Sequence, residues 1–337
     1  MSGQPVHLSL YVYAPNSVAP IVFAAAYGIS AGFHIWQCLY DLLCPCLLKK
    51  PADQLRSLHQ AFKLIGLHPL CAVLFTAGYA LRAYGSNGNY LYREGDSTSL
   101  IVFIMSQVLI YICPPLLELA NYHILGRLFY YVPYCSPLAP GKVLAIFGGV
   151  MGAVELLNPL GVSLSANPTS EPSQQQIGAA LTIAAISIQL FVIITFVCLA
   201  LLFHQRCRRA QVQTKTVTTI LFTLYASMAL IFIRCIYRLV EQTQHTHRDL
   251  SDFEALRHLS PLLRYESFFY IFETTLMLIN SVAWNIGNPA GLMPKDYHFY
   301  LAPNGSVVEG EKVVDNRSFT AKAIHILTFG VLYQRTR

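Results

Sequence analysis

The stretch VTTILFTLYASMALIFIRCIYRLV, residues 217–240, decides the fold of this chain. It is long and apolar enough to cross a bilayer as one helix, which takes about 20 residues. The same stretch carries Arg234 and Arg238 one helical turn apart, and Glu241 follows on the same face. Charges inside a bilayer are costly unless they face a partner or a water-filled cavity, so this helix requires polar neighbours.

Six further apolar stretches accompany this one, and together they predict an all-α, polytopic membrane protein with seven transmembrane helices. They lie near residues 18–40, 62–84, 98–121, 142–163, 178–203 and 265–286. The composition agrees, because the 337 residues are 54% hydrophobic and only 12% charged, about half the charged share of an ordinary soluble domain. The composition therefore excludes a typical water-soluble globular domain.

The basic residues divide unevenly between the two sides of these predicted spans. Sixteen of the 23 Lys and Arg residues fall on one side and five on the other, while Arg234 and Arg238 lie within a span. Short loops rich in Lys and Arg stay on the cytoplasmic side, so we expect the N-terminus outside and the C-terminus in the cytoplasm. The net charge is +6, but the basic residues form no arm, no stripe and no known nucleic-acid-binding module. This argues against a nucleic-acid partner.

The chain divides into one membrane domain, residues 1–291, and a cytoplasmic tail, residues 292–337. In the tail, apolar residues from Ala323 to Val331 lie beside Lys322 and Arg335, which suits an interfacial helix on the anionic leaflet. A loosely ordered tail fits the same residues. We expect an integral, multi-pass protein of the plasma membrane, with an internal membrane as the alternative.

Acidic side chains in the last predicted span match the arginines of the stretch quoted above. Glu266 and Glu273 are seven residues apart, which places both on one face of an α-helix and in its outer half. We expect an ion-pair network that joins Arg234, Arg238 and Glu241 to Glu266 and Glu273, with Glu155 of the fourth span as a third acid. Such a network either fixes helix packing alone or lines a polar cavity that receives the head group of an amphiphile.

A second polar cluster lies towards the cytoplasmic end of the third predicted span. Its members are Glu118, Asn121, Tyr122, His123 and Arg127. A carboxylate near a histidine suits general acid-base catalysis, but a polar cap at the membrane interface is the alternative that we favour. The sequence has no HExxH motif and no GxxxxGK[ST] loop, so we expect no metal, no cofactor and no ATP-hydrolysing motor.

These residues resemble the pattern of the fungal RTA1-like family, seven-span membrane proteins described as lipid-translocating exporters. The resemblance covers about residues 13–291 and rests on three ordered motifs: GYxxR ending at Arg82, LGR ending at Arg127, and IRxxYRxxE from Ile233 to Glu241. Further matching positions are Tyr13, Pro15, Ser17, Phe23, His34, Gln37, Pro114, Tyr122, Gly178, Gln189, Glu266, Tyr270, Met277, Pro289 and Gly291.

The chain also departs from this pattern. At five positions where the family commonly has a particular polar residue, this chain has a different residue: Phe75, Met151, Asn158, Glu273 and Asn288. Four polar residues occupy positions that are usually apolar: Glu118, Asn121, His123 and Glu155. The scaffold resembles the family while the polar lining differs.

The resemblance implies a fungal source and a transporter or translocase for lipid-like amphiphiles, hydrophobic metabolites or toxins, acting in export or resistance. Its partner would be a lipid or another amphiphilic small molecule, such as a sphingoid base, a sterol-like toxin or a porphyrin. The alternative is a membrane-embedded isomerase, cyclase or hydrolase that uses Glu118, His123 and Glu155. A receptor-like sensor shares the seven-span arrangement, but the sequence carries no receptor signature.

Overall fold

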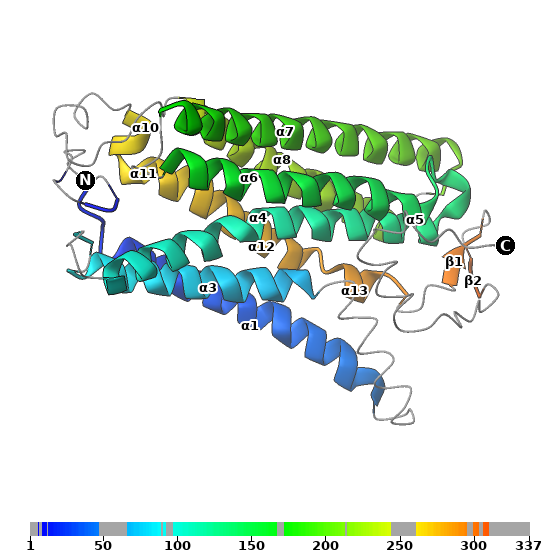
Figure 1. The fold of residues 1–337 in the computed structure, drawn as a ribbon. Coiled ribbons are helices and arrows are strands. Elements are labelled where there is room, and N and C mark those ends of the chain that lie inside the picture. Colours follow the sequence, from blue (N-terminus) through cyan, green and yellow to red (C-terminus); the bar gives the residue numbers. More distant parts are fainter. Residues whose placement is uncertain are drawn as a thin grey trace, which may run out of the picture.

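The structure is a bundle of long helices that run back and forth along one axis (Figure 1). The computed structural model describes residues 6, 9–11, 13–46, 66–88, 90–91, 97–166, 172–212, 214–243, 261–294, 299–302 and 306–309. The segment around Tyr11 lies at one end of the bundle, and a small hairpin of two strands lies at the other.

Each predicted span corresponds to a helix or to a run of joined helical segments. The long helices are α1 (Ala19–Cys46), α3 (Leu67–Ser86), α4 (Ser97–Tyr131), α6 (Gly149–Ala166), α7 (Pro172–Arg209), α8 (Lys215–Thr243) and α12 (Leu276–Ile286). The short segments are η1 (Pro133–Cys135), α5 (Pro140–Val143), η2 (Leu144–Gly148), α10 (Pro261–Arg264), α11 (Glu266–Phe269), η3 (Tyr270–Thr275) and α13 (Pro289–Leu292). The turns η2 and η3 are π-helical, and they join α5 to α6 and α11 to α12 without a break.

Among the described residues, five helices are long and apolar enough to cross a membrane. They are Ala19–Tyr40, Thr98–Tyr131, Pro140–Asn158, Gln176–Arg209 and Lys215–Thr243. The other two predicted spans are also helical, but α3 carries His68 and Arg82, and the last helix carries Glu266 and Glu273. Five candidate spans establish a polytopic membrane protein.

Among the described residues, two departures from helical structure are small. Strands β1 (Phe299–Leu301) and β2 (Val307–Glu309) pair antiparallel, and Ser9 and Leu91 form an isolated bridge. The hairpin lies in the segment that we expected to be a tail, and Ala302 accepts a hydrogen bond from Tyr134. The interfacial helix predicted near Ala323 lies outside the described residues.

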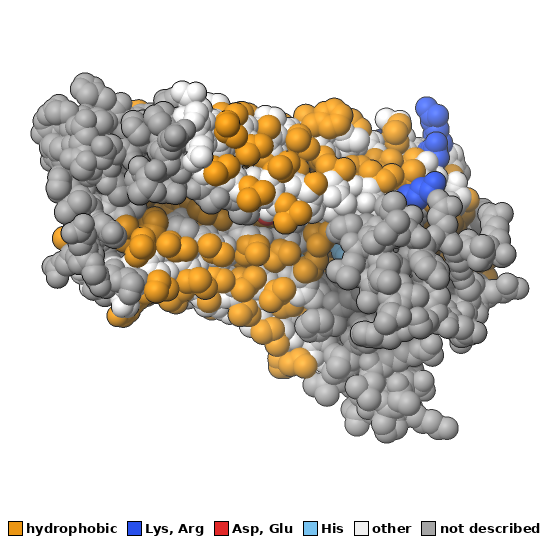
Figure 2. All heavy atoms as spheres, viewed as in Figure 1, with side chains coloured by type: hydrophobic (Ala, Val, Ile, Leu, Met, Phe, Trp, Pro, Cys, Tyr) orange, Lys and Arg blue, Asp and Glu red, His pale blue; other side chains and the backbone are white. Residues whose placement is uncertain are grey.

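The surface of the bundle is apolar where it would meet lipid. Large side chains such as Leu156, Phe191 and Phe222 are 69 to 74% exposed. Figure 2 shows these apolar side chains in long rows, with Lys and Arg gathered at one end. That end includes the last turn of α7, which carries Arg206, Arg208 and Arg209. An apolar belt of this extent is typical of a surface that faces hydrocarbon.

Candidate functional site

The predicted ion pairs between the sixth and seventh spans are present for one of the two acids. Arg234 of α8 donates through Nε to Glu273 of η3 at 2.7 Å, and Arg238 Nε lies 3.4 Å from the other oxygen of the same carboxylate. Arg238 also donates to Glu241 one turn further along α8. Two arginines and two carboxylates thus balance their charges inside the bundle.

The centre of this network is buried, while Arg238 and Glu241 at its edge are partly exposed. Glu273 is fully buried, and Arg234 is 6% exposed. The guanidinium of Arg238 stacks over the ring of Tyr111 on α4, 3.8 Å from the ring centre. A desolvated cation over an aromatic face is stabilised by the ring quadrupole, so α4 adds a third wall to the site. The network therefore joins three helices at the core of the bundle.

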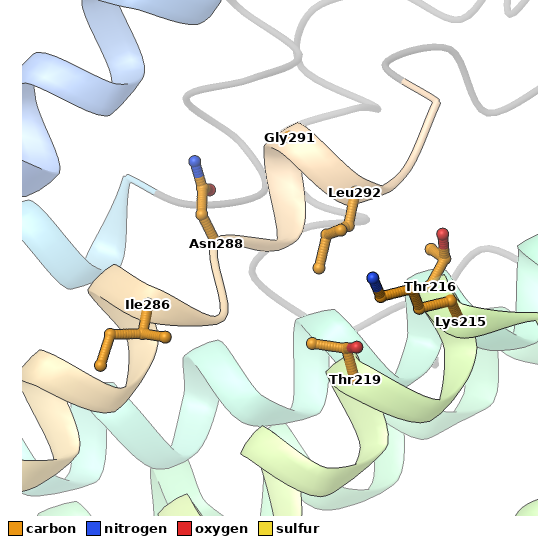
Figure 3. Close-up of a pocket in the computed structure, with 7 residues that line it drawn as sticks. All are labelled: Lys215, Thr216, Thr219, Ile286, Asn288, Gly291 and Leu292. Atoms are coloured by element: carbon orange, nitrogen blue, oxygen red, sulfur yellow. The ribbon is translucent and has the colours of Figure 1, made fainter.

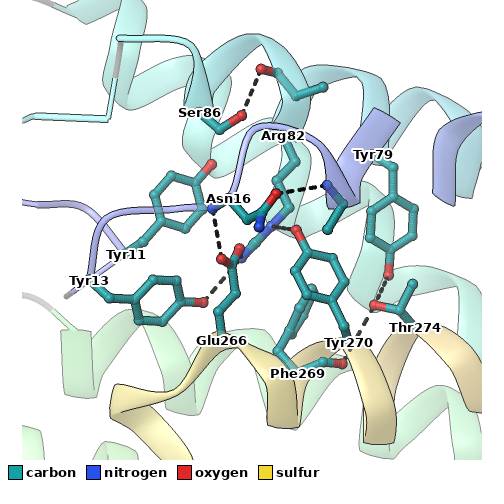
Figure 4. A network of polar contacts seen from close by, with 12 residues as sticks. Tyr11, Tyr13, Asn16, Tyr79, Arg82, Ser86, Glu266, Phe269, Tyr270 and Thr274 are labelled. Carbon is teal, nitrogen blue, oxygen red and sulfur yellow. Dashed lines mark hydrogen bonds and ion pairs between the residues drawn. The ribbon is translucent and has the colours of Figure 1, made fainter. Parts of the chain in front are cut away.

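The second acid, Glu266, has another partner than we predicted. Arg82 of α3 donates to its Oε1 at 3.0 Å, and the backbone N–H of Asn16 donates to its Oε2 at 2.8 Å (Figure 4). Tyr13 and Tyr270 accept further hydrogen bonds from the same guanidinium. The expected pairing of Glu266 with Arg234 and Arg238 is wrong.

The π-helical turn η3 explains this difference. In an α-helix, residues seven apart return to the same face within about 20°. A π turn holds an extra residue per turn, and η3 begins at Tyr270, between Glu266 and Glu273, and contains Glu273 itself. The two carboxylates therefore leave the helix in different directions, one towards α3 and the other towards α8.

Arg82 sits in an aromatic cage as well as an ion pair. Its guanidinium carbon lies 4.4 Å from the ring centre of Phe269 and 4.6 Å from that of Tyr11. Burial raises the pKa of Tyr11, whose hydroxyl therefore stays protonated. The segment before α1 is thus fastened to α3 and α11 at one end of the bundle (Figure 4).

The cluster on α4 is buried, so the interpretation as an interfacial cap is wrong for its central members. Glu118, Asn121 and Tyr122 are each fully buried. Gln189 of α7 donates to Glu118 Oε2 at 2.7 Å, and Tyr122 donates to Oε1 at 3.4 Å. Asn121 reaches the other way and donates to Ser227 Oγ of α8 at 2.8 Å. This cluster links α4 to both α7 and α8.

The remaining predicted residues lie at the margins of these groups. Glu155 on α6 is half-buried and close enough to Glu118 and Arg234 to interact with their charges. Arg127 donates to the backbone oxygen of Pro294 and so anchors the chain after α13 to α4. His123 is half-buried on α4. Among the described residues, no three His, Cys, Asp or Glu side chains are grouped so as to hold a metal ion.

A pocket of about 490 Å³ opens at the other end of α8, between that helix and α13 (Figure 3). Its walls come from the first turns of α8 and from the chain that leaves α12. They consist of Lys215, Thr216, Thr219, Ile286, Asn288, Gly291 and Leu292. The pocket and the Arg234 network thus lie at two levels of the same pair of helices.

Together these features define a class: a helical, multi-pass membrane protein with an apolar belt and buried ion pairs between its helices. A family model described as RTA1 like protein matches residues 70–296, and the chain belongs to this family of membrane proteins. The resemblance seen in the sequence motifs is confirmed.

Three relatives are named for lipid or porphyrin movement. The chain is 49% identical, over 99% of its length, to "Lipid-translocating exporter-like protein RTA1" of Leptosphaeria maculans, and it spans 61% of that relative's length. It is 25% identical, over 79% of its length and 82% of the relative's, to a protein of the same name from Ajellomyces capsulatus. It is also 25% identical, over 83% of its length and 91% of the relative's, to "Protoporphyrin uptake protein 1" of Saccharomyces cerevisiae. No solved structure matches the chain.

Proposed function

We propose that this protein is a translocase that moves lipid-like amphiphiles across a membrane, in export or resistance. The observation that carries the proposal is the charged network of Arg234, Arg238, Glu241 and Glu273 inside a bundle whose outer surface is apolar. Ionisable groups at membrane depth are expensive, and they commonly mark substrate or ion pathways. The names of the relatives support a substrate of this class.

The proposed arrangement has seven spans, with α3 and the joined helix α11–η3–α12 crossing the bilayer beside the five apolar helices. Burial supports this assignment, because the charges of both helices point into the bundle, where Arg82 pairs with Glu266. The proposed orientation puts the N-terminus outside. It is supported by Lys142, Lys215 and the arginines that end α7, which lie at the end opposite to Tyr11.

The proposed path follows the interface between α8 and the joined helix α11–η3–α12. Glu266 with Arg82 closes the outer end, and the Arg234 network forms a barrier further in. The pocket beside Lys215 would open the inner end (Figure 3). Glu155 would face the path from α6, because its half-buried carboxylate is close enough to Arg234 to interact with its charge.

The test is transport by the purified full chain in liposomes, using sphingosine, ergosterol and protoporphyrin as probes. Glu273→Gln keeps a hydrogen-bond acceptor for Arg234 but removes the charge, so we expect transport to fall while the thermal unfolding profile remains cooperative. The matched control is Glu309→Gln in the exposed strand β2. Normal transport in a well-folded Glu273→Gln variant would exclude the network from the path.

The membrane enzyme remains the second candidate, and one observation favours it. Glu118 is a fully buried carboxylate with Glu155 nearby, on helices where the resemblance leads us to expect apolar residues. Mass spectrometry of the probes recovered from the same liposomes separates the two functions. A new product mass that is lost in Glu118→Gln, without faster movement, would replace the translocase by an enzyme.

A further inference from the structure

Asn280 of α12 carries a buried amide with no hydrogen-bond partner among the residues that the structure describes. The residue is fully buried, and neither its Nδ2 nor its Oδ1 has a hydrogen-bond partner within the described part of the chain. Buried polar groups in folded proteins are nearly always hydrogen-bonded, so an amide with neither group paired calls for an explanation.

A second buried amide, on α4, is half-paired. The Nδ2 of Asn121 on α4 donates to Ser227 Oγ and to Met228 Sδ of α8, which fixes the orientation of the amide. Its Oδ1 is buried and has no partner within the described residues. Two helices thus present unpaired amide groups inside one bundle.

Contacts between α8 and α12 place these two residues at the same depth. The helices run antiparallel, and they touch at Arg234 with Glu273 and again at Thr223 with Gly287. Ser227 and Met228, which hold Asn121, lie between the two contacts on α8, and Asn280 lies between them on α12. Both asparagines therefore lie between the charged network and the inner pocket.

Asn280 belongs to one face of its helix. Glu273, Met277, Asn280 and Trp284 follow one another at spacings of four, three and four residues, and each is at most 1% exposed. The indole Nε1 of Trp284 also has no hydrogen-bond partner within the described residues. Polar groups thus continue along this face beyond the ion pair, towards the pocket.

We propose that Asn280 and Asn121 form a subsite that hydrogen-bonds hydroxyl groups of the transported amphiphile. An amide both donates and accepts, as a hydroxyl does, and the charged groups next to this level are already paired with each other. The subsite therefore suits a neutral polar group rather than an ion. This inference rests on the proposed function and adds a preference for hydroxylated head groups.

The test compares two probes with the same saturated 18-carbon chain and the same cationic amine, sphinganine and octadecylamine, of which only sphinganine carries hydroxyls. Transport rates of the full chain in liposomes are measured over a range of concentrations of each probe. In Asn280→Leu, we expect the half-saturating concentration of sphinganine to rise roughly tenfold, since a hydroxyl loses a buried partner, while that of octadecylamine stays the same. Thermal unfolding in detergent with each probe gives a readout of binding that does not depend on transport.

The matched control is Ser281→Ala, one residue further along α12. Ser281 is also buried, but its hydroxyl is hydrogen-bonded to Ser30 of α1 at 2.8 Å, so it faces away from the subsite. We expect both probes to respond equally in this variant. Should Asn280→Leu fail to fold, Asn121→Leu on α4 carries the same prediction.

The outcomes separate the two proposals. Equal effects on both probes, or no effect on either, would overturn the subsite while leaving the translocase in place. If the wild-type chain moves neither probe, the proposal that it translocates these amphiphiles is wrong. Thermal unfolding with each probe then still tests the subsite. Selective stabilisation of the wild type by sphinganine, absent from Asn280→Leu, then supports it, and equal stabilisation of the two proteins contradicts it.

Discussion

Gly287 of α12 lies so close to Thr223 of α8 that a Cβ on the glycine would meet the threonine Oγ1 at 2.4 Å. The contact brings the two helices close together next to the pocket at Lys215. Among the described residues, Thr223 Oγ1 also donates to Thr219 O at 3.0 Å, which holds its side chain in place.

We expect Gly287→Ala to destabilise the protein by about 1–3 kcal/mol, because the added methyl group forces the two helices apart. The double variant Gly287→Ala/Thr223→Ala should recover most of this loss, since it removes the atoms that the methyl group meets. Thermal unfolding in detergent measures both. Gly32→Ala is the control, because a Cβ there meets nothing within 4 Å.

Arg82→Met should be among the most damaging substitutions at the end of the bundle where α1 begins. It leaves the Glu266 carboxylate buried without its cation, and breaking a buried pair in this way costs about 3–5 kcal/mol. Adding Glu266→Gln should restore part of the stability because the unpaired charge is gone. The exposed Arg209→Met serves as the control, and equal unfolding midpoints for Arg82→Met and that control would contradict the prediction.

Gln189→Leu tests the buried carboxylate on α4. The substitution removes the donor to Glu118 Oε2, and an unpaired buried acceptor costs about 1–3 kcal/mol, more when it is charged. Replacing both residues, as Glu118→Leu/Gln189→Leu, should be less damaging than Gln189→Leu alone. Unfolding midpoints of the three variants decide this, and strictly additive losses would show that the pair does not act as a unit.

The proposed orientation predicts which sites can be glycosylated in a fungal host. The native sequons at Asn304 and Asn316 should stay unmodified, because the proposal places the segment after α13 in the cytoplasm. Asn89→Thr creates a sequon at Asn87, beyond the outer end of α3, and should add a glycan. A mobility shift removed by glycosidase detects each one. Modification of the native sequons alone would reverse the orientation.

Long apolar runs predicted the positions of the helices well, since each helix needs only its own residues. The charges of the stretch at 217–240 likewise predicted the pairing of Arg234 and Arg238 with Glu273, because i, i+4 spacing fixes a common face. These features depend on local periodicity, which a sequence displays directly.

Features that depend on the partner helix were harder to predict. Arg82 was counted with the outer loops although it lies inside α3, and its position two residues before the end of the predicted span 62–84 was the available signal. The bond from Gln189 to Glu118 joins residues 71 positions apart, so no local spacing indicates it. Burial of Glu118 likewise depends on how α7 and α8 pack around α4.

The π-helical turn η3 has a consequence for how this chain tolerates insertions and deletions. Its surplus residue lets Glu266 reach Arg82 while Glu273 reaches Arg234, and a regular α-helix would satisfy one of these pairs at the expense of the other. Loss of a single residue between Tyr270 and Thr275 would turn α11 by about 100° relative to α12. The length of this short segment is thus under a tighter constraint than the identity of most residues within it.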